Sequence, residues 1–173
     1  MIMALAFVSI GSNIDPEENV SKAVGLLKKQ VRIVGISTVY LTEPVERPDQ
    51  PAYYNCVIAI DTPLPPLELK HTVLRPIEDG LGRVRGEDRF SPRTIDLDLV
   101  LYEDQVIKSG ELTLPDPEIR TRPFLAGPLF ELAPNLIMPD SKEPIAKIAA
   151  RMRDGGMKPL VAYTNRLIRE ITS

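Results

Sequence analysis

Two aspartates lie two positions apart in a segment that otherwise has the composition of a buried strand. The segment reads SPRTIDLDLVLY, and Asp96 and Asp98 alternate in it with leucines. Residues i and i+2 of a strand share one face and lie about 7 Å apart. Two ionised carboxylates at that separation repel each other unless a cation neutralises them. Mg²⁺ binds oxygen ligands, commonly one or two carboxylates together with substrate phosphates, so the pair indicates metal-assisted phosphate chemistry.

Arginines precede this acidic pair, and the same stretch contains no lysine. The planar guanidinium group binds phosphate oxygens through paired hydrogen bonds. Phosphoryl transfer needs a metal that bridges phosphates and fixed positive charge for the transition state. The residues alone also allow a second interpretation, in which Asp96 and Asp98 form ordinary ion pairs with Arg93 and Arg85 on a solvated face. The arginines are Arg75, Arg83, Arg85, Arg89 and Arg93.

Composition limits the classes of protein to consider. The chain has 173 residues, 43% of them apolar and 26% charged, so we expect a single globular domain over residues 1–173. A net charge of −3 provides no basic field for nucleic acid. The single cysteine, Cys56, excludes an internal disulfide and fits a cytoplasmic location. No apolar run approaches the roughly 20 residues of a membrane-spanning helix. We expect a monomer with neither a nucleic-acid nor a membrane partner.

The first part of the chain has the order β-α-β-β-α-β. Helical spacing predicts a helix over 16–29, with Asp15 and Glu18 as a capping box, and a second helix over 66–81. Pro76 conflicts with the second helix because an interior proline removes a backbone hydrogen bond, so we expect a kink or an end there. The order is the split βαβ, or ferredoxin-like, pattern of an α+β protein, an antiparallel sheet with both helices on one face. Strands are predicted over 4–10, 31–41, 54–61 and 94–102.

Additions follow this core toward the C-terminus. The pattern predicts a small hairpin over 105–114 and helices over 122–131 and 145–152. The last segment, KPLVAYTNRLIREI, fits either a strand or a helix. In the strand that carries the acidic pair, alternation predicts Leu99 and Leu101 on one face and the two carboxylates on the other.

The motifs together resemble one family, 6-hydroxymethyl-7,8-dihydropterin pyrophosphokinase. The element Pro-Arg-x-x-Asp-x-Asp is specific in combination with the other motifs. The resemblance covers roughly residues 4–139 and leaves 140–173 as a variable C-terminal extension. It implies an enzyme of folate biosynthesis that uses two Mg²⁺ ions to transfer pyrophosphate from ATP to the hydroxymethyl group of the pterin, releasing AMP. The other motifs are IGSN, VYLTEPV, DQPAYYNCV, IEDGLGRVR, LTLP and RPFLAGPLFELAPNLIMP.

The resemblance assigns the phosphate and nucleotide side of the site. It implies that Asp96 and Asp98 hold the two Mg²⁺ ions between the phosphates of ATP, and it makes Asp98 a candidate to accept the proton of the attacking hydroxyl. Arg83 and Arg93 complete the catalytic set by contacting phosphates. For most of these residues taken alone, an ordinary surface or core role is the alternative. The ATP-binding residues that the resemblance implies are Arg75, Glu78, Arg83, Arg85, Arg93, Leu99, Thr113, Asp116 and Arg122.

The resemblance also assigns a pterin side. A pterin ring needs flat faces to stack on and an amide to read its edge. Asn55 supplies both a donor and an acceptor, and aromatic side chains supply the faces. Without the resemblance, core packing would be the simpler interpretation of Phe124. The implied pterin-binding residues are Thr42 and Val45, through their backbone groups, and Tyr53, Asn55, Phe90 and Phe124.

Three residues depart from the usual pattern of the family. Phe90 replaces a tryptophan and loses its indole donor, and Gly86 stands where a polar residue is common. Asp116 replaces the usual histidine on the ATP side, where its carboxylate would repel a triphosphate. We therefore expect weakened or altered ATP handling. The departures keep open a second hypothesis, a catalytically weakened nucleotide- or pterin-binding homologue, whereas the negative net charge disfavours a metal-dependent nuclease.

Overall fold

One antiparallel sheet forms the centre of the molecule. A computed structural model describes residues 2–44, 49–86, 92–153 and 155–173. The sheet has the strand order β5-β1-β4-β3-β8, and β2 also pairs with β4. The strands are β1 (Ala4–Ser12), β2 (Arg32–Ile36), β3 (Tyr40–Thr42), β4 (Tyr53–Thr62), β5 (Asp96–Tyr102) and β8 (Lys158–Pro159). All these pairings are antiparallel, so the predicted α+β fold is confirmed.

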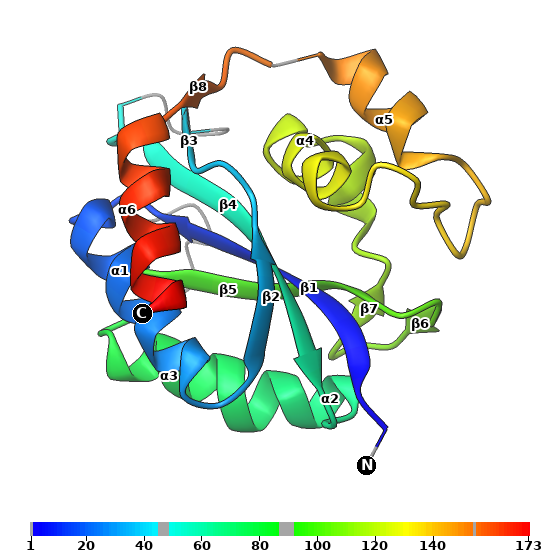
Figure 1. Ribbon diagram of the computed structural model, residues 1–173, viewed down its shortest axis with the longest axis horizontal. Coiled ribbons are helices and arrows are strands. Elements are labelled where there is room, and N and C mark those ends of the chain that lie inside the picture. The colour runs from blue at the N-terminus through cyan, green and yellow to red at the C-terminus, as the bar shows by residue number, and fades with distance from the viewer. Residues whose placement is uncertain (1, 45–48, 87–91, 154) are drawn as a thin grey trace.

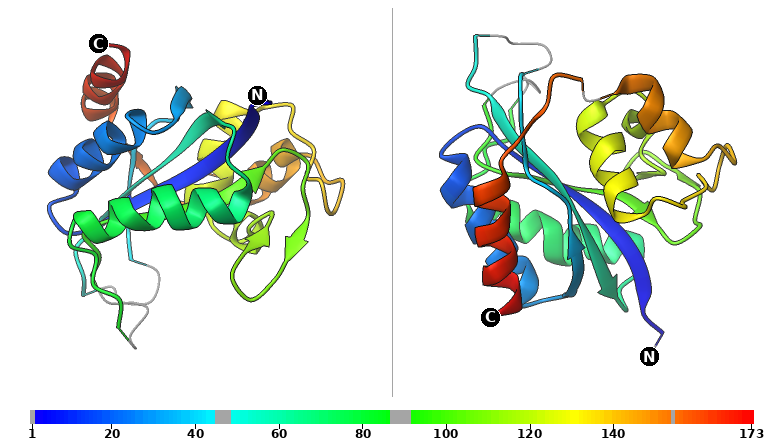
Figure 2. Two further views of the ribbon diagram at one scale, coloured as in Figure 1. Left: turned by 90° about the horizontal axis from the view of Figure 1, so that it is seen from below. Right: turned by 45° about the horizontal axis from the view of Figure 1, so that its top comes forward.

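Both predicted helices of the core lie on one face of this sheet (Figure 1). The first is α1 (Pro16–Lys28), and the second is a continuous helical segment made of α2 (Pro66–Leu69), η1 (Lys70–Leu74) and α3 (Arg75–Gly80). Their buried side chains pack with those of β1 and β4 in one hydrophobic cluster. Burial of each large apolar side chain contributes roughly 1.5–3 kcal/mol. The C-terminal helix α6 (Val161–Thr172) lies beside α1 on the same face (Figure 2).

The opposite face is covered by α4 (Pro123–Leu132), against which α5 (Ile145–Met152) packs, and both helices lie close to the predicted bounds (Figure 2). Their buried side chains form a second hydrophobic cluster with Phe7 and Val57 of the sheet. The predicted hairpin is present as β6 (Ile107–Lys108) and β7 (Thr113–Leu114), and the short helix η2 (Pro117–Arg120) follows it. The last segment forms both a strand, β8, and a helix, α6. Among the described residues, no helix is long and apolar enough to cross a bilayer.

The second helix accommodates Pro76 through a wider helical turn just before it. The segment η1, just before Pro76, is a π-helix, in which the N–H of Arg75 donates to the carbonyl of Lys70. A proline ring collides with the carbonyl four residues earlier in a regular α-helix, and a π turn changes the spacing at that point. The helix therefore continues past the proline, with its distortion in the preceding turn.

The predicted alternation of β5 is wrong beyond Leu99. The pairing of β1 with β5 shifts register between Phe7 and Val8, so Val8 faces Leu99 while Phe7 faces Leu101. A β-bulge of this kind adds one residue to one strand and changes the face of those that follow. Leu99 lies in the cluster under α1, whereas Leu101 lies in the cluster under α4.

Two further local predictions are also wrong. The predicted strand 31–41 is divided into β2 and β3 around the buried Ser37, whose hydroxyl accepts a hydrogen bond from the N–H of Val57 at 2.9 Å. Asp15 precedes α1 in a left-handed conformation (φ 41°), and its side chain makes no capping hydrogen bond. The capping box with Glu18 is therefore not formed.

Candidate active site

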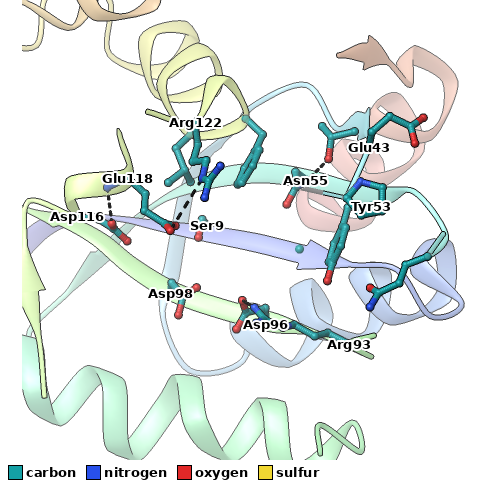
Figure 3. A pocket seen from close by; sticks show the side chains of 16 residues that line it. Ser9, Glu43, Tyr53, Asn55, Arg93, Asp96, Asp98, Asp116, Glu118 and Arg122 are labelled. Atoms are coloured by element: carbon teal, nitrogen blue, oxygen red, sulfur yellow. Dashed lines mark hydrogen bonds and ion pairs between the residues drawn. The ribbon is translucent and has the colours of Figure 1, made fainter. Parts of the chain in front are cut away.

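The acidic pair points into a cavity on the sheet face that carries α4. The first cavity, of about 260 Å³, is lined by residues of β1, β4, β5, η2 and the start of α4. Figure 3 shows Asp96 and Asp98 extending from β5 toward a space bounded on its far side by Arg122 and Asn55. The aspartates therefore share a face, as predicted, and that face is part of a cavity.

Strand register brings the two aspartates into line with residues of β1 and β4. Gly11 of β1 lies opposite Asp96 on one side and opposite Asn55 on the other, and Ser9 lies opposite Asp98. A Cβ atom added to Gly11 would come within 2.7 Å of Oδ1 of Asn55. Gly11 therefore leaves the space that the Asn55 side chain occupies.

Hydrogen bonding fixes the orientation of Asn55 in this cavity. Its Nδ2 donates to Oγ1 of the buried Thr42 at 2.6 Å, so the amide is held by a neighbouring strand. Tyr53 and Phe124 also line the cavity, and burial is the main cause that raises the pKa of Tyr53. The structure thus brings together four predicted pterin-side residues. Val45 and Phe90, the other two, lie outside the described residues.

The pair is electrostatically asymmetric. Asp96 accepts a hydrogen bond from Nη1 of Arg93 at 2.7 Å, so the ion-pair interpretation is correct for this residue. Asp98 is exposed to the cavity, yet the surrounding protein raises its pKa above its ordinary range, first by loss of bulk solvent and then by the negative charges of Asp96, Glu78 and Asp116. Four carboxyl groups, those of Glu78, Asp96, Asp98 and Asp116, therefore lie close enough to affect one another here.

Glu78, a buried member of the acidic cluster, is held by hydrogen bonds from Leu97 and Arg85. Its side chain is 5% exposed; its Oε2 accepts from the N–H of Leu97 at 2.8 Å, and its Oε1 accepts from Nη2 of Arg85 at 2.5 Å. Burial raises the pKa of Glu78, and the hydrogen bond from Leu97 opposes that change. Arg85 also pairs with Asp79. The alternative pairing of Arg85 with Asp98 is therefore wrong.

The Asp116 carboxylate accepts a hydrogen bond from nearby backbone. Its Oδ1 accepts from the N–H of Glu118 at 2.9 Å and caps η2. Burial is the main cause that raises the pKa of Asp116, and the Glu118 hydrogen bond lowers it. The carboxylate that replaces the usual histidine is thus partly turned onto a helix, although its charge still reaches Asp98.

A second cavity, of about 200 Å³, adjoins the first. Leu97, Leu99 and Leu112 supply apolar walls, while Lys70, Glu111 and Thr113 line it with polar or charged groups. Asp98 and Asp116 line both cavities. The two cavities therefore meet at these carboxylates, and two predicted ATP-side residues, Leu99 and Thr113, lie in the second one.

The predicted arginines occupy different positions. Arg93 and Arg122 line the first cavity, and Nε of Arg122 lies 4.0 Å from Oε1 of Glu118. Arg83 donates from Nη1 to the carbonyl of Val84 at 2.6 Å and lines neither cavity. Arg75 is exposed at the start of α3 and also lines neither. Among the described residues that line these two cavities, Arg75, Arg83 and Arg85 are not included.

A buried asparagine next to the site was not singled out from the sequence. Asn13 is 3% exposed; its Oδ1 accepts from the N–H of Arg93 at 2.8 Å, and its N–H donates to the Arg93 carbonyl at 3.1 Å. Its Nδ2 donates to Oε1 of Gln50 at 3.2 Å and to the carbonyl of Pro51 at 3.3 Å. Asn13, directly after the end of β1 at Ser12, therefore holds the backbone of Arg93 and of Pro51 in place.

The protein ligands available for a cation are few. Within the part of the chain that the structure describes, no group of three or more histidine, cysteine, aspartate or glutamate side chains could hold a metal ion. Asp96 and Asp98 supply two carboxylates, so an ion held between them would need further oxygen ligands from elsewhere. Such an incomplete set is typical of Mg²⁺ sites that use substrate phosphates.

Comparison with known proteins identifies the family. Residues 7–134 match the family model described as 7,8-dihydro-6-hydroxymethylpterin-pyrophosphokinase (HPPK). The chain belongs to the HPPK family. The family predicted from the sequence is therefore confirmed, and the matched residues include the acidic pair, both cavities and α4.

Two relatives show how far the similarity extends. A 2-amino-4-hydroxy-6-hydroxymethyldihydropteridine pyrophosphokinase of Methylorubrum extorquens is 38% identical over 159 residues, covering 90% of this chain and 98% of its own. The folic acid synthesis protein fol1 of Schizosaccharomyces pombe is 35% identical over 167 residues, covering 95% of this chain. The chain spans only 22% of that longer protein.

A solved structure supports the fold. The crystal structure of Plasmodium falciparum HPPK-DHPS with pteroate superimposes with a TM-score of 0.70 at 13% sequence identity. The alignment covers 88% of this chain and 44% of that one. At this identity the likeness concerns the fold, and it agrees with the ferredoxin-like arrangement predicted from the sequence.

Proposed function

We propose that this chain transfers a pyrophosphoryl group from ATP to 6-hydroxymethyl-7,8-dihydropterin, giving the pterin diphosphate and AMP in folate biosynthesis, and that it requires two Mg²⁺ ions. One observation carries the proposal: two cavities of different chemistry meet at the acidic residues Asp98 and Asp116. A transfer between two bound substrates needs such a meeting point, because the donor and acceptor atoms must come within about 3–3.5 Å. Family membership supports the identity of the two substrates.

The first cavity is the proposed pterin site. Asn55, held by Thr42, presents the amide that would read the edge of the ring. Phe124 and Tyr53 supply aromatic faces on the same cavity. Because these side chains come from adjoining elements that are already in place, little ordering is needed on binding. The hydroxymethyl group would then point along the sheet toward Asp96 and Asp98.

The second cavity is the proposed nucleotide site. Leu99 and Leu112 offer apolar surface to a purine, and Thr113 offers polar groups. A triphosphate that extends from there toward the first cavity passes Asp98 and approaches Arg93 and Arg122. Their guanidinium groups would provide fixed positive charge where charge develops during transfer.

Asp96 and Asp98 fit a divalent cation by their donor chemistry and electrostatics. Both are carboxylates on one strand face, and after loss of solvent the negative charges of Asp96, Glu78 and Asp116 contribute to the raised pKa of Asp98. When bound, Mg²⁺ would neutralise phosphate charge and make the acceptor hydroxyl more acidic. Asp98, at the wall shared by the cavities, is also the chain's candidate to accept that hydroxyl's proton, because it lies where the two substrates would meet.

Release of AMP tests this function directly. We expect the purified chain to form AMP and pterin diphosphate only when ATP, Mg²⁺ and hydroxymethyldihydropterin are all present. ADP formation would indicate a monophosphoryl kinase, and AMP formation without the pterin would indicate hydrolysis; either result would contradict the proposal. Nucleotide or pterin binding without turnover would favour the alternative, a catalytically weakened homologue, for which the replacement of histidine by Asp116 is the motivating observation.

We also propose one domain over residues 1–173 in a monomeric, cytoplasmic protein. Tyr163 and Leu167 of α6 are buried in the same cluster as α1, which supports treating residues 140–173 as an extension packed onto the domain. The single cysteine is buried, and burial raises the pKa of Cys56 to about 12. An unreactive core thiol suits a reducing compartment.

A further inference from the structure

The second cavity contains a basic side chain that the resemblance did not assign. Lys70 lines this cavity together with the acidic residues Asp98, Glu111 and Asp116. Among the described residues that line it, Lys70 is the one with a positive charge. A cation in an acidic cavity that must accept a nucleotide is therefore a candidate ligand-binding group.

Distorted helix geometry places Lys70 at the cavity. Lys70 is the first residue of the π-helix η1, and its carbonyl accepts the hydrogen bond from the N–H of Arg75. Its Nζ donates to the carbonyl of Glu111, in the loop of the β6–β7 hairpin. Single π turns inside helices are often found at functional sites. An ammonium group has three donors, so a bond to one carbonyl leaves capacity for a ligand.

The position of the shared wall decides which part of a nucleotide Lys70 would meet. Under the proposed function, the reacting phosphate must lie where the cavities meet, at Asp98 and Asp116. The remainder of the nucleotide then extends into the part of the second cavity that the first does not share, which is lined by Lys70, Leu112 and Thr113. That part of the cavity is left for the base and ribose.

We propose that Lys70 is a nucleotide-binding residue that donates a hydrogen bond to an acceptor atom of the nucleoside half of ATP. The inference rests on the proposed function, since it uses the location of the reacting phosphate. Arg75 was predicted to bind ATP but lines neither cavity. The inference therefore places Lys70, and not Arg75, in contact with the nucleotide. A purely structural role, as a tether between η1 and the hairpin, is the competing explanation for the Glu111 contact.

Binding of two nucleotides to Lys70→Met tests the assignment. We expect its dissociation constants for AMP and for α,β-methylene-ATP with Mg²⁺ to rise by the same factor, about 10-fold. The KM for the pterin should stay unchanged, and Lys70→Arg should recover most of the affinity. Lys108→Met, an exposed lysine of β6 that lines neither cavity, is the matched control and should bind as the wild type does.

Three outcomes would overturn the inference. Unchanged nucleotide affinity with a lowered Tm would make Lys70 a tether only. Unchanged affinity and Tm would leave it without a role at the site, and a loss confined to the triphosphate analogue would move its contact to the phosphates. Failure of the proposed function can be distinguished from failure of this inference. If the wild-type protein forms no AMP, but Lys70→Met binds both nucleotides more weakly than the wild type by the same factor, the assignment of Lys70 stands and the proposed function does not.

Discussion

The two cavities that meet at Asp98 and Asp116 are built in different ways. The first depends on strand register: Gly11 separates Asn55 from Asp96 across three adjacent strands, and Thr42 holds the Asn55 amide. The second combines leucines of β5 with a hairpin loop and with a lysine from a distorted helix. Side chains on paired strands have little freedom, whereas loop and helix positions can vary without disturbing the sheet. We infer that the proposed pterin half is set mainly by strand pairing, and the proposed nucleotide half more by helix and hairpin positions.

The largest effect on activity is expected for a substitution of Asp98, on the wall that the two cavities share. Asp98 lines both cavities, so Asp98→Asn should lower kcat about 10³-fold, the scale seen when one group that stabilises a transition state is removed. Steady-state kinetics with both substrates saturating measures this. Asp104→Asn, which changes an exposed aspartate just after β5, is the matched control and should leave kcat unchanged. A kcat for Asp98→Asn within a few-fold of wild type would contradict a role for this carboxylate.

Gly11→Ala should damage the pterin half selectively. The new methyl group would lie 2.7 Å from Oδ1 of Asn55, so the amide must move. Overpacking of this kind costs about 1–3 kcal/mol, and we expect pterin affinity to fall roughly 10- to 100-fold. Calorimetric titration with the pterin and with α,β-methylene-ATP should show a loss for the pterin only.

Gly25→Ala provides the control for that experiment. An added Cβ at Gly25, in α1, meets no atom within 4 Å. Exchange of glycine for alanine inside a helix usually stabilises by roughly 0.5–1 kcal/mol, so this variant should bind both substrates normally and melt slightly higher. Equal losses of pterin and nucleotide affinity in Gly11→Ala would remove the distinction between the two halves.

Substitutions of Asp116 should change the affinity for ATP, with a smaller effect than the two substitutions above. Asp116→Asn keeps an oxygen that can cap η2 but removes the negative charge that reaches Asp98. We expect the affinity for ATP to rise about 10-fold, because one repulsive carboxylate near the triphosphate is lost. Asp116→His, which restores the usual family residue, should raise it at least as much. An unchanged dissociation constant in both variants would show that capping already removes the repulsion.

The smallest effect concerns stability in the absence of metal and substrates. The pKa of Asp98 is raised above its ordinary value of 3.8, so the folded state holds this proton more tightly than the unfolded chain does. The stabilisation that results is complete below the ordinary pKa and is lost as pH rises through the raised one. At neutral pH, Asp98→Asn should therefore raise Tm by no more than about 2 °C, because the side chain is exposed and solvent screens much of the repulsion. Thermal melts of both proteins between pH 4 and 8 should converge toward the acid end; parallel curves would contradict the proposed repulsion.

Strand patterns in the sequence predicted the sheet and the acidic pair because a period of two residues fixes which face a side chain occupies. Asp96 and Asp98 therefore share one face, as predicted, and that face lines the first cavity, whereas Asn55 was implied by the resemblance and not by the strand pattern. The same rule failed at Leu101, because a bulge depends on how β1 pairs with β5 and not on the local sequence. The need for glycine at position 11 also could not be predicted from the local sequence, because it arises from the Asn55 side chain on another strand.

The nucleotide half could be predicted less completely. Leu99 and Thr113 were implied by resemblance alone and do line the second cavity. Lys70 gave no signal, because a regular helix would have been assumed there and only the conflict at Pro76 indicated a distortion. Asn13 gave no signal of its own beyond the IGSN motif, because its partners, Arg93 and Gln50, are distant in sequence. Contacts of this kind depend on tertiary structure, which local spacing does not encode.

The central claim is that Asp96 and Asp98 hold the metal that joins the two substrates. The most direct test is a crystal structure of the protein with α,β-methylene-ATP, hydroxymethyldihydropterin and Mn²⁺ in place of Mg²⁺, with data collected for anomalous scattering. The account predicts anomalous peaks that both aspartates contact, with the pterin against Asn55 and the base beyond Asp98 toward Lys70. Substrates bound with Asp96 still on Arg93, and no anomalous density beside either aspartate, would contradict it.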